Sequence, residues 1–115
     1  MVWTPVEARA YLEKSNLVSF TRSVKKISGY IFDSSRELIL AEQNSKQVTV
    51  YVAVAPLNMP EVNVLKEYIP TTIRRGRHAD IESVARSLGF SHKAYSLQIQ
   101  SKAGLERLLT WYQYT

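Results

Sequence analysis

The chain has 115 residues, of which 45% are hydrophobic and 22% are charged, and this composition excludes an intrinsically disordered protein and fits one folded domain. It contains no cysteine, which excludes disulfides, thiolate zinc sites, iron–sulfur clusters and cysteine nucleophiles. Fifteen Lys and Arg against ten Asp and Glu give a net charge of +5, and that sign favours a polyanionic or acidic partner.

The sequence also predicts a cytoplasmic protein that does not enter a membrane. The longest apolar run, residues 48–56, is far shorter than the roughly 20 residues that a membrane-spanning helix requires. The N-terminal segment carries Glu7 and Glu13 in place of the basic start and apolar core of a secretory signal.

The first predicted element is a helix over residues 5–15. Thr4, Pro5 and Glu7 supply an N-cap hydroxyl, a proline at the first helical position and a glutamate three residues after the cap. Apolar residues follow at helical spacing, and the run ends at Ser15.

Three strands are predicted next, over residues 24–32, 37–43 and 47–55, because β-branched and aromatic residues occur there in short runs separated by polar turn formers. Gly29, inside the first run, indicates a β-bulge or a close approach of another backbone. In the third run, four valines at alternate positions share one face of the strand: Val48, Val50, Val52 and Val54.

Two helices are predicted in the next part of the chain. The first is a short helix over residues 61–68, after a loop bracketed by Pro56 and Pro60. The second covers residues 81–88, where Asp80 supplies the N-cap and apolar residues recur at helical spacing.

A strand and a helix are predicted at the C-terminal end. Tyr95, Leu97 and Ile99 alternate with polar residues, which indicates a fourth strand with a polar outer face. Ser101 supplies the N-cap of the last helix, whose leucines form one apolar stripe. Together the elements predict a single α+β domain over residues 1–115, mainly an antiparallel four-stranded sheet with helices packed on one face.

The clearest chemical bias lies in the loop before the predicted 81–88 helix. Four basic side chains surround one glycine there: Arg74, Arg75, Arg77 and His78. Guanidinium groups beside the exposed amides of a helix N-terminus would hold a phosphate group. The alternative interpretation is a solvated arginine loop whose side chains pair with nearby glutamates.

A second basic group, formed by Arg22, Lys25 and Lys26, lies at the start of the predicted sheet. Lys93 adds another cation just before the fourth strand. We predict that the two basic groups share a surface, because the 81–88 helix must return its apolar stripe to the sheet and would carry the loop before it to the sheet's edge. Together the two groups would then make a stripe of phosphate contacts.

The seven tyrosines and Trp3 are further candidates for contact with nucleic-acid bases, since exposed aromatic rings stack on bases. The residues predicted to be exposed are Trp3, Tyr30, Tyr68 and Tyr114. The residues predicted to pack inside the protein are Tyr11, Tyr51, Tyr95 and Tyr112.

Catalysis has little support in the sequence. His78 with Asp80, and His92 with Lys93, are the candidates for acid–base pairs, and the acid-x-lysine spacing of metal-dependent nucleases is missing. We therefore predict no catalytic residue, no metal site and no cofactor.

The sequence predicts a domain that binds DNA or RNA, with DNA favoured. Its layout, a small α+β domain with a basic turn between sheet and helix, is similar to the target-reading domains of nucleases in restriction and other defence systems. That resemblance implies a recognition domain for a larger or partnered nuclease. The alternative is a protein-binding module, such as an immunity or inhibitor protein, that presents the same arginines to an acidic partner.

Overall fold

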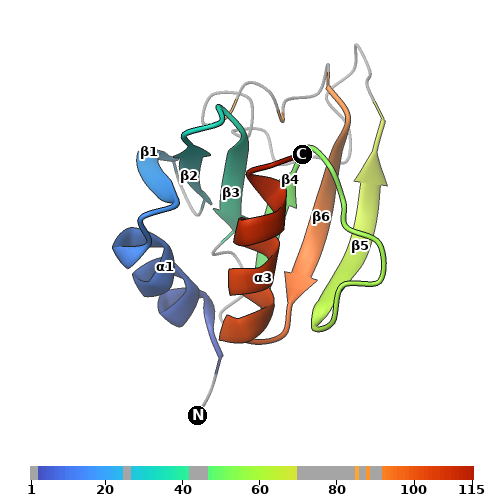
Figure 1. The fold of residues 1–115 in the computed structure, drawn as a ribbon, viewed down its shortest axis with the longest axis horizontal. Helices are drawn as coiled ribbons and strands as arrows, with labels where there is room; N and C mark the ends of the chain where they lie inside the picture. The colour runs from blue at the N-terminus through green and yellow to red at the C-terminus, as the bar shows by residue number, and fades with distance from the viewer. Residues whose placement is uncertain (1–2, 25–26, 42–46, 70–84, 86–87, 89–91) are drawn as a thin grey trace.

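The computed structural model describes residues 3–24, 27–41, 47–69, 85, 88 and 92–115. These residues form an α+β domain in which two helices lie against an antiparallel sheet with the strand order β1-β2-β3-β4-β6-β5 (Figure 1). The fold class is as predicted, but the sheet has six strands where four were predicted. The elements are α1 (Pro5–Lys14), β1 (Val18–Val24), β2 (Ile27–Phe32), β3 (Glu37–Ala41), β4 (Val48–Val52), β5 (Val62–Tyr68), β6 (Ala94–Ile99) and α3 (Lys102–Tyr112).

Both terminal helices begin at the caps that the sequence predicts. The Thr4 hydroxyl accepts a hydrogen bond from the Glu7 amide at 3.4 Å, and Pro5 follows the cap at the first helical position. The Ser101 hydroxyl accepts one from the Gly104 amide at 3.1 Å at the start of α3. These side chains satisfy amides that have no partner inside the first helical turn.

The predicted single strand over 24–32 is wrong, because the structure has a hairpin of two strands there. β1 and β2 pair antiparallel, with Val24 opposite Ile27. The predicted bulge is present, but it lies in β1, where the register shifts between Phe20 and Arg22, opposite Gly29 and its neighbour.

The predicted helix over residues 61–68 is also wrong, because this segment forms β5. Among the described strands it lies at the edge of the sheet and pairs with β6 alone, from Val62 opposite Ile99 to Tyr68 opposite Ala94. A register shift between Val64 and Lys66 interrupts the alternation of side chains. The regular alternation of side chains between the two faces is therefore broken in the middle of the strand. This explains why apolar and polar residues do not alternate in the sequence of this segment.

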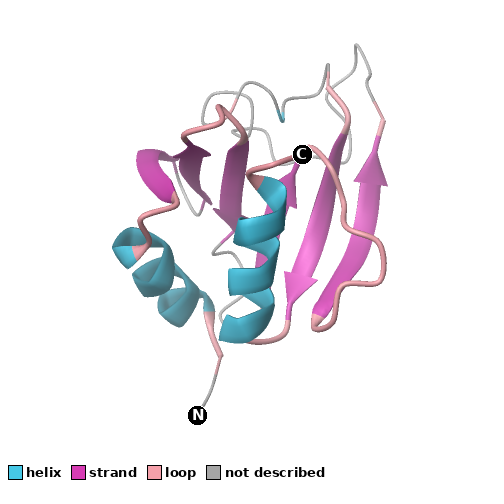
Figure 2. Ribbon diagram, in the orientation of Figure 1, coloured by secondary structure: helices cyan, strands magenta, loops and turns pink. Residues whose placement is uncertain are grey.

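The two faces of the sheet have separate cores. α1 and α3 both cover the side that we call the front face (Figure 2), as predicted for these two helices. Alternate residues of the strands pack there with both helices, including Tyr30, Leu38, Leu40, Val48, Val50, Val52, Leu97 and Ile99. The predicted alternation of valines is therefore confirmed within β4.

The opposite side, which we call the back face, has its own small core around Ile27, Ile39 and Ala41. Two described residues of the connection between β5 and β6, Ala85 and Leu88, are buried in this core. The rest of the predicted 81–88 helix lies outside the described residues. Ser96, expected on the polar outer face of its strand, is buried as well.

Candidate nucleic-acid interface

The predicted basic residues divide into those that the structure describes and those that it does not. Arg22 lies in β1, and Lys93 lies directly before β6. The other predicted contacts fall outside the described residues: Arg74, Arg75, Arg77, His78, Lys25 and Lys26. Their arrangement in space therefore stays a prediction.

The net charge is distributed unevenly along the chain. The described residues contain eight of the fifteen Lys and Arg and seven of the ten Asp and Glu, so they contribute +1. The remaining residues contribute +4, with seven basic and three acidic side chains. The described part of the domain is thus close to neutral, and most of the net positive charge lies in the connecting segments.

Arg22 is exposed and belongs to the back face of the sheet. Residues paired across antiparallel strands point to the same side. The pairing relates Arg22 to Gly29, then to Ile39, whose side chain lies in the back core. The same row continues across the sheet through Tyr51, Ser96 and Lys66.

The long connection between β5 and β6 leaves and returns on this same face. Tyr68, two residues before Pro70, packs against the back core, and Ala85 is buried in it. The described residues that flank the segment with the three arginines, Tyr68 and Ala85, therefore both lie at the back face. Arg22 is exposed on the same face of the sheet.

An aromatic group lies at the β5 side of the back face. The rings of Tyr51 and Tyr68 are 6.1 Å apart, and the Lys66 ammonium lies 5.1 Å from the centre of the Tyr68 ring. Burial, and then the neighbouring Tyr68 hydroxyl, raise the pKa of Tyr51 to about 12. Its hydroxyl therefore stays protonated near neutral pH. Lys66 is not among the predicted contacts, because its segment was predicted as a helix.

Lys93 has a different environment from Arg22. Its ammonium lies 3.0 Å from the Glu67 carboxylate and 5.6 Å from the centre of the Tyr95 ring. Glu67 and Tyr95 are paired residues, and Tyr95 packs against the front core. Hydrogen bonds to Tyr95 and then to Glu67 raise the pKa of Lys93. Arg22 and Lys93 are therefore associated with opposite faces of the sheet.

The predicted exposure of the aromatic residues is correct in part. Tyr114 is 82% exposed, whereas Tyr30 is 1% exposed and was wrongly predicted to lie on the surface. Its position in β2 places it on the front face, under the helices. Trp3 and Tyr68 are half-buried. Tyr112 is fully buried, as predicted.

Within the described part of the chain, no group of three or more His, Asp or Glu side chains could hold a metal ion. None of the described helices is long and apolar enough to cross a membrane. No protein-family model, curated protein or solved structure matches this chain.

Proposed function

We propose that this protein is a nucleic-acid-binding domain that recognises DNA through its back face and the arginine loop attached to it. The observation that supports this proposal is that Tyr68 and Ala85, which flank the segment with the three arginines, pack on the face on which Arg22 is exposed. Phosphate groups would be contacted by Arg22 and by basic residues of the connecting segments. Neutralisation of several phosphates supplies most of the affinity of such domains.

The uneven charge supports the same proposal. Like charges that are close together in the sequence, such as Lys25 with Lys26 and Arg74 with Arg75 and Arg77, repel each other at a cost in stability. A near-neutral scaffold that carries +4 in its connecting segments is therefore better explained by an anionic partner than by solubility alone.

The test is the salt dependence of binding to duplex DNA, single-stranded DNA and RNA, measured by fluorescence anisotropy. The logarithm of the affinity should fall linearly with the logarithm of the salt concentration, by roughly 0.9 per phosphate contact on duplex DNA. Replacing Arg74, Arg75 and Arg77 by alanine should reduce this slope by roughly 2 to 3. Absence of binding to all three nucleic acids at about 50 mM salt would contradict the proposal.

A matched control removes the same number of positive charges from the helical side of the domain. Arg9, Lys14 and Arg107 lie on α1 and α3, and two of them already pair with carboxylates, Arg9 with Glu13 at 3.4 Å and Arg107 with Glu61 at 3.6 Å. Their replacement by alanine should leave the slope almost unchanged. An equal loss in both triple variants would show that only the net charge matters.

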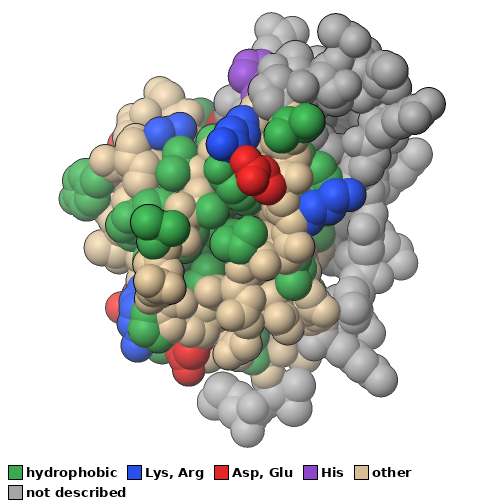
Figure 3. Space-filling view, turned by 90° about the vertical axis from the view of Figure 1, so that its right-hand side faces the viewer, with side chains coloured by type: hydrophobic (Ala, Val, Ile, Leu, Met, Phe, Trp, Pro, Cys, Tyr) green, Lys and Arg blue, Asp and Glu red, His purple; other side chains and the backbone are tan. Residues whose placement is uncertain are grey.

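A second candidate is a protein-binding module, and the edge of the sheet favours it. Four apolar side chains of β5 and its flanking loops are exposed, namely Leu57, Val64, Leu65 and Ile69. Figure 3 shows hydrophobic side chains gathered on this side of the molecule, with charged groups between them. An unpaired strand edge with apolar side chains is a common docking surface for an extended peptide. Failure to bind any nucleic acid would favour this second function.

A further inference from the structure

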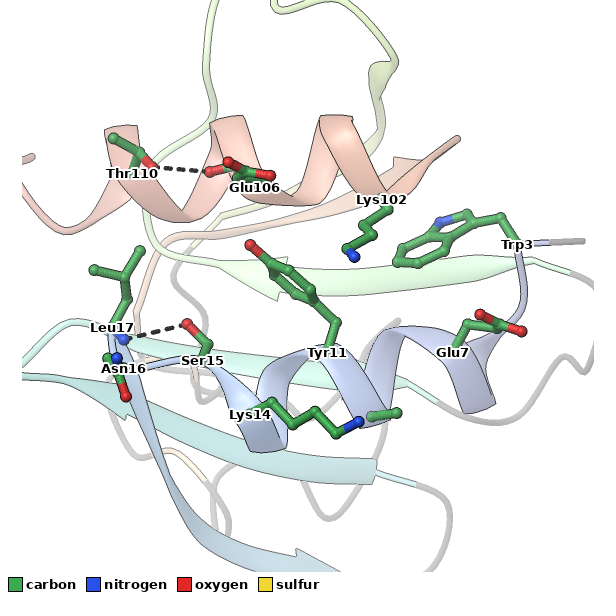
Figure 4. A pocket seen from close by; sticks show the side chains of 11 residues that line it. Trp3, Glu7, Tyr11, Lys14, Ser15, Asn16, Leu17, Lys102, Glu106 and Thr110 are labelled. Atoms are coloured by element: carbon green, nitrogen blue, oxygen red, sulfur yellow. Dashed lines mark hydrogen bonds between the residues drawn. The ribbon is translucent and has the colours of Figure 1, made fainter. Parts of the chain in front are cut away.

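A groove lies between α1 and α3, remote from the back face of the sheet. Its volume is about 650 Å³, which is within the usual range for small-molecule sites. Its lining includes Trp3, Glu7, Tyr11, Lys14, Lys102 and Glu106. Figure 4 shows Lys102 facing Tyr11 across the groove, Trp3 and Glu7 toward one end of it, and Glu106 further along α3.

Two aromatic rings form part of the wall. The Trp3 indole is held in place because its Nε1 donates a hydrogen bond to the Ile99 carbonyl at 2.9 Å. Tyr11 is half-buried, and the Lys102 ammonium lies 5.6 Å from the centre of its ring. These rings are therefore ordered before any ligand arrives, which lowers the entropy cost of binding.

Four charged side chains, two of each sign, surround these rings. Among the described residues, none of the four forms an ion pair within 4.0 Å. Lys102 and Glu106 have the i, i+4 spacing that allows a helical ion pair, yet Lys102 lies over Tyr11 instead. Elsewhere on the same helices, Arg9 and Arg107 are both paired with carboxylates. The groove thus keeps both signs of charge available to a ligand.

We propose that this groove binds a small zwitterion, an α-amino acid with an apolar or aromatic side chain. Its carboxylate would be bound by Lys102, and its ammonium by Glu106 one helical turn further along α3. Glu7 and Lys14 on α1 would add one charge of each sign at the rim. Its side chain would pack against the two rings. A simple anion or a simple cation would meet like charges in the same groove, so a molecule that carries both charges complements it best.

The Tyr11 hydroxyl adds a hydrogen-bond donor to the groove. Burial, and then the Glu106 carboxylate, raise the pKa of Tyr11. The hydroxyl consequently remains protonated throughout the neutral pH range and can donate to a carboxylate.

The test is titration of the isotope-labelled full chain with L-phenylalanine, followed by NMR chemical shifts. We expect saturable shifts in α1 and α3 with a dissociation constant of about 1 mM or below. Phenylpropionate, which lacks the ammonium, and phenethylamine, which lacks the carboxylate, should each bind about tenfold more weakly, as expected for one lost charged contact. Equal binding of all three compounds, or no saturation below about 20 mM, would overturn the proposal.

Variants locate the site and separate it from nucleic-acid binding. Lys102→Met and Glu106→Gln keep the size of the side chains, and each should weaken L-phenylalanine about tenfold. Arg107→Met, on the other side of α3 and paired with Glu61, is the matched control and should bind like the parent protein. Unchanged binding in both groove variants would overturn the proposal. All three variants should retain the parent affinity for DNA.

Discussion

Tyr112 joins three elements of the front core through one hydroxyl group. The hydroxyl donates to the Glu37 carbonyl at 2.8 Å and accepts from the Ala53 amide at 2.8 Å. Its ring packs edge-to-face on Phe32, with the centroids 5.4 Å apart. The hydrogen bonds connect the end of α3 to the start of β3 and to the chain after β4. They satisfy the Ala53 amide and the Glu37 carbonyl, two backbone groups that lie beside the last turn of α3.

We predict that Tyr112→Phe lowers the free energy of unfolding by about 1–3 kcal/mol, because it leaves a partly buried amide and carbonyl without this partner. Urea unfolding measures this loss. Tyr114→Phe is the control, because its side chain is exposed, and it should change the stability by less than about 0.5 kcal/mol. Equal stabilities of the two variants would contradict the role assigned to Tyr112.

The same residue predicts a dependence of stability on alkaline pH. Burial raises the pKa of Tyr112 to about 12 from its usual value of 10.0. The folded state therefore favours the protonated phenol. Its contribution is complete below pH 10 and is lost as the pH rises from 10 to about 12. Tyr51 has the same direction of shift, but it is more exposed, so solvent screens its contribution.

We expect the difference in unfolding free energy between the parent protein and Tyr112→Phe to shrink by up to about 3 kcal/mol between pH 10 and pH 12. Urea unfolding at several pH values in this window measures the difference directly. Comparison of the two proteins cancels the titration of lysines and of the other tyrosines. Parallel pH profiles would show that the Tyr112 phenol does not titrate as described.

At the scale of elements, the start of α3 is fixed to the turn before β5 through Glu61. The Glu61 backbone has a φ of 64°, and its carbonyl accepts a hydrogen bond from the Gln100 amide at 2.9 Å. Its carboxylate accepts a hydrogen bond from the Ser101 hydroxyl and pairs with Arg107 at 3.6 Å. The turn therefore lies directly against the first turn of the helix, where Gly104 leaves room for it.

Gly104→Ala should not stabilise the protein, although alanine is favoured over glycine in a helix by about 1 kcal/mol. An added Cβ would lie 3.1 Å from the Glu61 carbonyl oxygen and 3.2 Å from the Glu61 Cβ. We expect a net loss of about 1 kcal/mol in urea unfolding, because that turn is held by hydrogen bonds and resists displacement. The control, Thr110→Ala on the exposed side of α3, should change the stability by less than about 0.5 kcal/mol. A gain in Gly104→Ala would show that the turn yields easily.

The elements that could be predicted from sequence are those with local signals. α1 and α3 have capping hydroxyls and an apolar stripe, and β4 alternates strictly, so these were located within a few residues. β5 lacks such a signal because its bulge breaks the alternation and its exposed edge does not require apolar residues. The β1–β2 hairpin was missed because Lys25 and Lys26 are not typical turn formers. Strand pairing depends on distant partners that a local pattern does not contain.

At the scale of the whole molecule, the sheet separates two surfaces with different chemistry. The front face is covered by two helices, whose outer sides carry paired charges and the groove. The back face carries Arg22 at one edge and Lys66 at the other, in one row of paired residues. The basic residues are evident in the sequence, but the face of the sheet on which each one lies depends on the strand register, which the sequence does not reveal.

Because Arg22 and Lys93 are associated with opposite faces of the sheet, we predict that they contribute unequally to DNA binding. Arg22→Ala should weaken duplex DNA binding at all sequences alike and reduce the salt slope by about 1, as the loss of one phosphate contact does. Lys93→Ala should have a smaller effect, because Lys93 lies toward the other face and would have to leave Glu67 to reach a phosphate. Fluorescence anisotropy between about 50 and 200 mM salt measures both slopes.

Crosslinking of bound DNA distinguishes contact with one face from contact that extends around the sheet edge. If the back face is the interface, crosslinks should join DNA to the β1 segment that contains Arg22 and to residues 70–84, since the residues that flank this segment, Tyr68 and Ala85, pack on the same face. Peptides from α1 and α3 should remain free of crosslinks, because both helices cover the front. A second outcome combines the two experiments. If crosslinks form at β1 and at residues 70–84, and Lys93→Ala reduces the salt slope as much as Arg22→Ala does, then DNA also reaches past β6. Crosslinks confined to α1 and α3 would exclude the back face as the interface.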